Sequence, residues 1–367
     1  MYPTISHFIE DVFGVFIPLP IQTFGFFVAL AFLIASWTLS LELKRKEEQG
    51  ILKVFVQDKI VGLKATTWQL LSSAIIGFII GFKLTEAVFY YSDFVNNPQE
   101  FILSSRGHFL GGIIGAIVSS FTKYRDYAKK ALPKPKTIQE KIHPNEIVGN
   151  ITMLAAAAGL LGAKIFHNLE NMDAFLADPI GQLLSFSGLT FYGGLICGAA
   201  VVIWYGKKFN IHYSHIADAA APGLMLAYGI GRLGCHFAGD GCWGEFNSCD
   251  IPEQINFLPN WIWHYDYKNA VVGPPGGLVY PTAIYESIMA FLLFSFLWII
   301  RKRFAIPGML FGIYLIVNGL ERFIIEKIRV NTTYDIFGHE ITQAEIISFL
   351  LIITGLSIVI YLKRFKK

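Results

Sequence analysis

Apolar runs of about twenty residues recur along this chain and limit it to one class of fold. Only 16% of the 367 residues are charged and the mean hydropathy is +0.50, whereas soluble domains carry about 25% charged residues. The composition therefore predicts an all-α polytopic membrane protein, a single integral membrane domain over residues 1–367. Nine segments are apolar and long enough to cross or enter a bilayer: 23–43, 69–91, 108–121, 147–168, 189–205, 216–235, 280–300, 309–325 and 343–362.

Two of these segments, 108–121 and 189–205, are short and rich in glycine. Either or both can enter and leave on one side of the membrane, so we expect seven to nine transmembrane helices. The net charge of +3 is small and gives no indication of a nucleic-acid partner.

Basic residues gather in alternate loops, after the first, third, fifth and seventh segments and at the C-terminus. The positive-inside rule assigns these loops to the cytoplasm, so the N-terminus faces outward and the C-terminus is cytoplasmic. Residues 1–20 contain Glu10 and Asp11 but no Lys or Arg, unlike the basic start of a cleaved signal peptide. The first helix is therefore expected to remain as an anchor.

The loop at 236–279 is a long outward segment that contains Trp261, Trp263, Tyr265 and Tyr267. Two interpretations are open. The aromatic residues can form a belt at the lipid headgroups, or the segment can form a small head that receives a partner chain.

An internal repeat relates residues 70–122 to residues 150–203. Gly81, Pro98 and Gly111 recur as Gly162, Pro179 and Gly193, at offsets of 81, 81 and 82 residues. A shared register over three positions indicates a duplicated pair of helices. Each copy also carries a lysine within an apolar run, Lys83 and Lys164, which either reaches to the interface or binds lipid phosphate.

The segment 229–244 carries the densest set of polar residues at a membrane boundary. It places Arg232, His236 and Asp240 among glycines, directly after an apolar run. Charged groups at such a boundary are costly and indicate a functional site, while glycine lets the backbone approach a ligand closely.

A second charged group lies at the outer end of the eighth segment. Arg322 and Glu326 are four residues apart and share a helix face, and Arg329 follows within one turn. The group is either an ion pair that closes the helix or a clamp for phosphate, which guanidinium binds through a planar fork. Glu286, next to Tyr285 in the seventh segment, is an intramembrane carboxylate that needs a partner.

Several motifs, taken in order, resemble the prolipoprotein diacylglyceryl transferase family. The family's Gly-Arg-x-Gly-Asn-x-x-Asn-Gly-Glu-x-x-Gly signature is similar to the segment from Gly231 to Gly244. The other similar motifs are Thr23-Phe24-Gly25, Thr190-Phe191-Tyr192-Gly193-Gly194-Leu195, Pro281-Thr282-Ala283-Ile284-Tyr285-Glu286, Arg322…Glu326…Arg329 and Thr342-Gln343…Ile346-Ile347-Ser348.

Departures from the family pattern fall at positions with polar or reactive side chains. Tyr192 stands where the family has histidine, Cys235 where it has asparagine and Asp240 where it has glutamate, with one residue inserted before Gly244. The family's first-helix tyrosine is Phe24. The unit around residues 81–116 looks like an added copy of the second and third family helices.

The resemblance implies a transferase of the bacterial inner membrane. It would move the diacylglyceryl group of phosphatidylglycerol to the lipobox cysteine of a prolipoprotein signal peptide, the first step of lipoprotein maturation. Phosphatidylglycerol, the signal peptide and membrane lipid are then the partners, and no metal or organic cofactor is expected. The expected catalytic residues are Arg232, Arg322, Tyr192, His236 and Glu326, and the expected substrate-binding residues are Arg232, Asp240, Gly244, Tyr285, Glu286, Arg329, Gly193 and Gly194.

Within that assignment, the arginines stabilise the phosphate leaving group, and Asp240 and Glu326 orient them. The thiol nucleophile needs a base or a positive field, for which His236, Tyr192 and Glu326 are candidates. In an oxidising compartment, Cys235, Cys242 and Cys249 can include one disulfide, with Cys242 and Cys249 as the preferred pair.

Three other functions remain open. The chain can be a related lipid transferase with a different acceptor, as the changes at Tyr192 and Cys235 suggest. It can be a small-molecule transporter, since transporters are often built from repeats. It can also be an inactive member that presents lipid or peptide to another protein.

Overall fold

The computed structural model of the chain describes residues 1–185, 188, 190–253, 257–336 and 338–365. Leu189 at the start of the predicted fifth segment, residues 254–256 of the predicted head, and Lys366 and Lys367 of the basic tail lie outside the described residues.

Long helices dominate the described part of the chain, and each predicted apolar segment overlaps one of them. They are α2 (Thr23–Glu48), α3 (Thr67–Phe89), α6 (Phe109–Lys130), α7 (Val148–Glu170), α10 (Phe191–Lys208), α11 (Tyr213–Ala238), α13 (Thr282–Ile300), α14 (Met309–Glu326) and α15 (Gln343–Phe365). The mainly helical membrane class is therefore confirmed. By length and composition, five of the described helices can span a bilayer: α2, α3, α7, α13 and α15.

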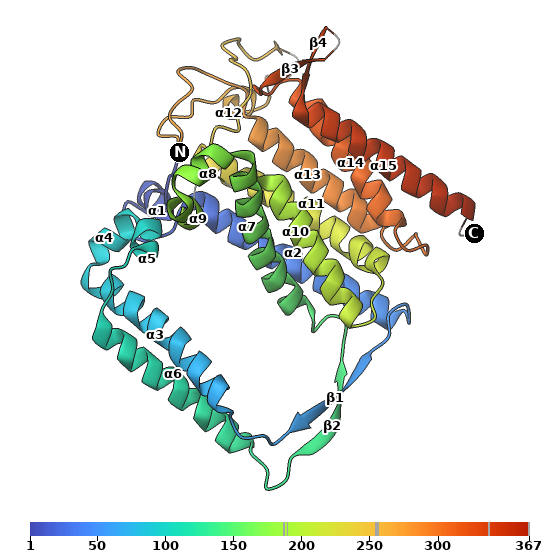
Figure 1. Cartoon of the computed structure of the whole chain (residues 1–367). Helices are drawn as coiled ribbons and strands as arrows, with labels where there is room; N and C mark the ends of the chain where they lie inside the picture. The colour runs from blue at the N-terminus through green and yellow to red at the C-terminus, as the bar shows by residue number, and fades with distance from the viewer. Residues whose placement is uncertain (186–187, 189, 254–256, 337, 366–367) are drawn as a thin grey trace.

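Helix α11 lies at the centre of the main bundle, against α2, α13 and α14 (Figure 1). Small residues allow the close contacts. A Cβ on Gly223 would lie 2.5 Å from Thr38 Oγ1, and one on Gly229 would lie 2.8 Å from the Phe291 ring. Because α11 carries Arg232 in its last two turns, this packing fixes the depth and the direction of that side chain.

Two helical hairpins, α3–α6 and α7–α10, share one plan. In each, two six-residue helices join the long ones: α4 (Tyr91–Asn96) and α5 (Pro98–Leu103), then α8 (Met172–Ala177) and α9 (Pro179–Leu184). In each, glycines bring the long helices together. A Cβ on Gly81 would lie 2.3 Å from Gly111 O, and one on Gly162 would lie 2.5 Å from Gly193 O.

The lysines of the two hairpins bind the connecting segments. Lys83 donates to the carbonyls of Phe101 at 3.0 Å and Arg106 at 2.7 Å, and Lys164 donates to Ser185 Oγ at 2.9 Å. These contacts close each hairpin at the same end. The origin of the two hairpins by duplication stays a prediction.

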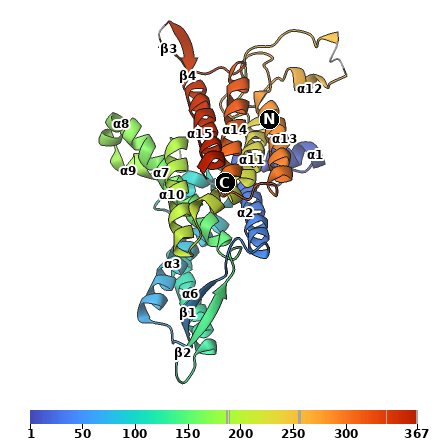
Figure 2. The ribbon, with the colours of Figure 1, turned by 90° about the vertical axis from the view of Figure 1, so that its right-hand side faces the viewer.

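The α3–α6 hairpin stands apart from the main bundle (Figures 1 and 2). A two-stranded antiparallel ribbon links them, formed by β1 (Phe55–Val61) and β2 (Lys136–Ile142), with Val61 paired to Lys136. The sequence did not predict these strands, because their hydrogen-bond partners are far apart in the chain.

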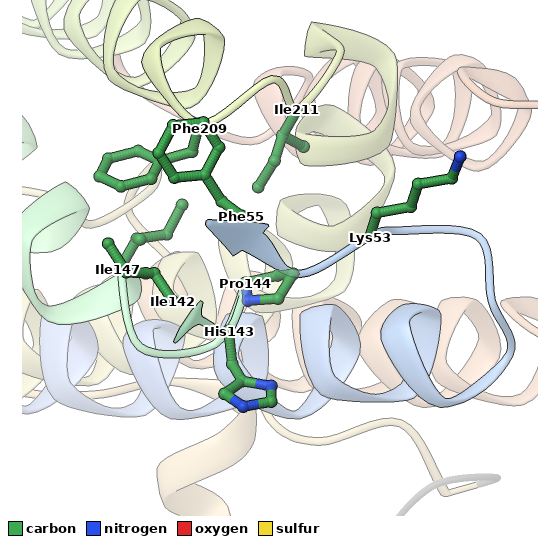
Figure 3. A pocket seen from close by; sticks show the side chains of 8 residues that line it. All are labelled: Lys53, Phe55, Ile142, His143, Pro144, Ile147, Phe209 and Ile211. Atoms are coloured by element: carbon green, nitrogen blue, oxygen red, sulfur yellow. The ribbon is translucent and has the colours of Figure 1, made fainter. Parts of the chain in front are cut away.

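Apolar packing anchors the ribbon to the bundle where both strands leave it. Figure 3 shows Phe55, Ile142, Ile147, Phe209 and Ile211 gathered there. The rings of Phe55 and Phe209 meet edge to face, 5.3 Å apart. Ile147 and Ile211 belong to the buried core beneath the ribbon.

Short elements cover one end of the bundle. They are α1 (Ile5–Phe13), α12 (Asn260–Trp263), and the antiparallel pair β3 (Thr333–Ile336) and β4 (His339–Thr342). Figure 1 shows the N-terminus near this end and the C-terminus at the other end of α15.

Candidate functional site

Three arginines from different parts of the chain meet at one carboxylate. Glu286, in the second turn of α13, is fully buried. Its oxygens accept Arg232 Nε at 3.0 Å, Arg322 Nη1 at 2.9 Å and Arg329 Nη1 at 3.1 Å. The predicted partner of this intramembrane carboxylate is therefore a set of three guanidinium groups.

Arg232 is held on α11 by contacts beyond the carboxylate. Tyr228 lies one turn earlier, and the Arg232 guanidinium lies 5.2 Å from the centre of its ring, within the range of a cation–π interaction. The Tyr228 hydroxyl donates to Glu321 Oε1 on α14 at 3.5 Å. These contacts restrain the guanidinium in addition to its ion pair with Glu286.

Arg322 bridges two carboxylates. It pairs with Glu286 and, four residues along α14, with Glu326 Oε2 at 2.9 Å. Glu326 also accepts a hydrogen bond from Asn331 Nδ2 at 2.7 Å. The predicted Arg322–Glu326 pair thus forms as part of a larger network.

Arg329 lies beyond the end of α14, where the loop after α11 meets the loop after α14. Gly244 forms a β-bridge with Arg329, and Glu245 N donates to Ile328 O at 3.0 Å. A Cβ on Gly244 would lie 2.4 Å from Ile328 O, so only glycine fits this junction. In the described part of the chain, Arg329 Nε is buried with no hydrogen-bond partner.

The charges of the cluster favour an anion. All three guanidinium groups contact Glu286, and Arg322 also contacts Glu326, so three positive charges meet two carboxylates in direct contact. The unpaired Nε of Arg329 adds a donor that lacks an acceptor, and buried donors are normally satisfied. A phosphate group has the charge and the several acceptor oxygens that this arrangement lacks.

Asp240 and Cys242 lie next to Arg232, in the loop after α11. Asp240 Oδ1 accepts from Cys242 N at 3.2 Å, and no arginine contact of Asp240 occurs in the described chain. Arg232 Nη1 instead donates to Cys242 Sγ at 3.3 Å. A hydrogen bond from Cys235 and the nearby Arg232 charge lower the pKa of the Cys242 thiol to about 7.

His236 contacts aromatic residues of the 236–279 segment. Its Nδ1 lies 3.0 Å from the Tyr267 hydroxyl, and its ring meets the Tyr265 ring edge to face. Burial raises the pKa of Tyr267 well above its usual range, so the hydroxyl stays protonated in this hydrogen bond. Among the described residues, no contact joins His236 to the three arginines.

Tyr192, in the first turn of α10, lies within electrostatic reach of Arg322 and Glu326. Its neighbours Gly193 and Gly194 instead face α7, where added Cβ atoms would lie 2.5 Å from Gly162 O and 3.0 Å from Gly159 O. The glycines therefore serve helix packing, which orients Tyr192.

Tyr285, next to Glu286, is directed toward the 236–279 segment. Its hydroxyl donates to Ile262 O in α12 at 2.5 Å. This contact ties the helix that carries Glu286 to the aromatic segment above it.

Two members of the cluster's surroundings were not predicted from the sequence. Tyr228 supports Arg232, and its position four residues earlier on the same helix could have indicated it. Thr282 Oγ1 donates to Cys242 O at 2.8 Å, a contact between distant segments that no local pattern marks.

Comparison with known proteins gives consistent matches. The family model described as Prolipoprotein diacylglyceryl transferase matches residues 11–134 and 127–361. Phosphatidylglycerol--prolipoprotein diacylglyceryl transferase of Leptospira interrogans is 27% identical over 286 residues, covering 64% of this chain and 85% of the relative.

The proteins of the same name from Dehalococcoides mccartyi and Shouchella clausii are also similar. The first is 30% identical over 219 residues, with 59% of this chain and 76% of the relative covered. The second is 27% identical over 256 residues, with 70% and 85% covered.

Proposed function

Because this chain belongs to the prolipoprotein diacylglyceryl transferase family, we propose that Arg232, Arg322 and Arg329 hold the phosphate of phosphatidylglycerol. The chain is a transferase that moves a diacylglyceryl group from this lipid to prolipoproteins in lipoprotein maturation. The observation that carries the site assignment is the meeting of the three guanidinium groups at Glu286.

The reaction needs stabilisation of a leaving phosphate. The cysteine thiolate attacks the diacylglyceryl carbon that carries the phosphate ester. A carbon–sulfur bond forms, and the bond between that carbon and the phosphate oxygen breaks. Glycerol phosphate leaves with the bonding electrons. Donors already fixed by Glu286 and Glu326 meet the developing charge without reorganising, and this rigidity is what the carboxylates contribute.

The thiol proton needs an acceptor, for which His236, Tyr192 and Glu326 are the candidates. Tyr192 lies near Arg322 and Glu326, but its phenol is protonated at neutral pH, so it serves as a hydrogen-bond donor rather than as the base. His236 Nδ1 contacts the Tyr267 hydroxyl, and Glu326 contacts Arg322 and Asn331. The positive field of the arginines also favours the thiolate of the substrate.

We propose that the cluster faces outward and that the N-terminus lies on the same side. Support comes from the basic residues in alternate loops and the positive-inside rule. Nine crossings, with the C-terminus in the cytoplasm of a bacterial inner membrane, fit this orientation. The 236–279 segment then forms an outward head beside the cluster, suited to receive the signal peptide that carries the lipobox cysteine.

The test is lipid transfer in membranes, with labelled phosphatidylglycerol and a lipobox peptide. Arg232→Ala and Arg322→Ala are each expected to slow transfer by about 100-fold or more, as for the loss of one preorganised donor. Arg322→Lys should also fail to restore the rate, because an ammonium group does not replace the planar fork.

Arg106→Ala is the matched control, since Arg106 pairs with Asp93 near the surface of the α3–α6 hairpin. Its transfer rate should equal that of the unmodified protein. Normal transfer by both Arg232→Ala and Arg322→Ala would overturn the assignment.

A further inference from the structure

Two thiols lie beside Arg232 and have no part in the proposed transfer. Cys235 is buried in the last turn of α11, and Cys242 is half-buried in the following loop. Their sulfur atoms lie within 4.8 Å of each other. Arg232 Nη1 donates to both, at 4.0 Å to Cys235 Sγ and 3.3 Å to Cys242 Sγ.

This pairing differs from the preferred expectation of a Cys242–Cys249 disulfide. Cys249 is exposed, and its carbonyl accepts from Trp263 Nε1 at 3.1 Å. All four cysteines are described, and all are free thiols.

The segment between the two thiols can adapt to a covalent link. A disulfide needs its sulfur atoms about 2.05 Å apart, so Cys242 must move toward the helix or rotate its side chain. The loop contains Gly239 and Gly241, with φ of +67° and +90°, and glycine permits backbone changes closed to other residues. Cys235, on the helix, supplies the fixed partner.

The charges around the sulfur atoms favour thiolate chemistry over metal binding. Asp240 completes a set of three metal-ligand atoms with the two thiols. However, Arg232 contacts both sulfurs and Arg329 lies nearby, and positive charge at this distance opposes a bound cation. The same charges stabilise a thiolate at Cys242, which is the less buried of the two residues.

We propose that Cys235 and Cys242 form a reversible disulfide that controls Arg232. The Cys242 thiolate attacks a protein or small-molecule disulfide and forms a mixed disulfide, with release of one thiolate. Cys235 then loses its proton, attacks the Cys242 sulfur and expels the second thiolate. The two thiols are oxidised, and the exchanging disulfide is reduced to two thiols.

A disulfide removes the thiols to which Arg232 donates. It also shortens the loop that contains Gly244, which forms a β-bridge with Arg329. Oxidation should therefore slow lipid transfer, a consequence that rests on the proposed function. Loss of a hydrogen bond to a charged group corresponds to a rate about tenfold lower.

Mass spectrometry of the purified full chain tests the link without any activity measurement. In a Cys197→Ser/Cys249→Ser background, treatment with glutathione disulfide should lower the mass of the chain by two hydrogen atoms. No thiol should then react with maleimide. Reduction should restore two reactive thiols. Adding Cys235→Ser should stop the reaction at a glutathione adduct on Cys242. Two free thiols after oxidation, or a Cys242–Cys249 link in the unmodified chain, would overturn the proposal.

Transfer rates form the second arm. The oxidised chain should be about tenfold slower than the reduced chain, whereas Cys235→Ser/Cys242→Ser should respond to neither reagent. If the disulfide forms but the transfer rate does not change, the proposal that the disulfide controls Arg232 is wrong. A chain inactive in both redox states contradicts the proposed function instead, while the mass measurement still decides the link.

Discussion

At the scale of single residues, one carboxylate organises the site. Glu286→Gln keeps the shape of the side chain but removes the charge that three arginines share. Removing one partner of a buried ion pair costs about 3 kcal/mol or more. We expect a lower melting temperature and a transfer rate reduced by about 100-fold, measured by thermal unfolding in detergent and by lipid transfer.

Glu140→Gln provides the control, since Glu140 pairs with Lys59 at 2.7 Å on the exposed ribbon. Exposed pairs contribute less than about 1 kcal/mol, so neither measurement should change appreciably. Equal effects of the two substitutions would contradict the role given to Glu286.

The Cys242 thiol makes a second residue-scale prediction. Its lowered pKa, about 7, means that thiolate is present above this pH and is lost as the pH falls through it. In the Cys197→Ser/Cys249→Ser background, the pH profile of iodoacetamide labelling at Cys242 should have its midpoint near 7. Arg232→Ala removes a stabilising charge and should move the midpoint to higher pH. An unmoved midpoint would show that Arg232 does not act on this thiol.

The sequence predicted which residues form the arginine–Glu286 cluster better than it predicted which of them contact each other. It marked Arg232, Arg322, Arg329 and Glu286, but expected Asp240 to orient an arginine, whereas Asp240 accepts from Cys242 N. Pairing between helices depends on how each helix is rotated about its axis. Helix α13 is apolar on all sides, so no polar face indicates the direction of Glu286.

At the scale of elements, the junction of two loops positions Arg329. Gly244→Ala would place a Cβ 2.4 Å from Ile328 O and 2.8 Å from Thr282 Cγ2, and a backbone atom cannot yield as a flexible side chain can. We expect the β-bridge to open, Arg329 to shift and lipid transfer to fall by about tenfold or more. The rate is compared with that of Gly149→Ala on α7, where an added Cβ meets nothing within 4 Å. Equal transfer rates for the two variants would contradict the role of this junction in positioning Arg329.

The sequence predicted the long helices because apolar length alone marks them. It missed the extent of α6, predicted to residue 121, which continues through charged residues to Lys130. It also missed β1 and β2. Their ladder joins residues such as Gln57 and Glu140, so its stability comes from a distant partner and from the apolar anchor at Phe55 rather than from a local signal.

At the scale of the whole molecule, the α3–α6 hairpin is separable from the site. The arginines and Glu286 belong to α11, α13, α14 and the loop after it, all far along the chain from the hairpin. The ribbon pairs Val61 with Lys136 directly, so a two-residue Asn-Gly turn in place of residues 62–135 should close it as a β-hairpin.

This deletion should yield a folded and active enzyme. It removes two predicted crossings, an even number, so α7 and all later helices keep their orientation. It costs the Tyr91–Pro18 and Gln99–Gln22 hydrogen bonds at the surface but leaves the core at Ile147 and Ile211 intact. Size-exclusion chromatography and lipid transfer check the outcome, with Arg322→Ala in the deleted chain as the inactive control. A folded, membrane-inserted product without activity would mean that the hairpin guides a substrate to the cluster.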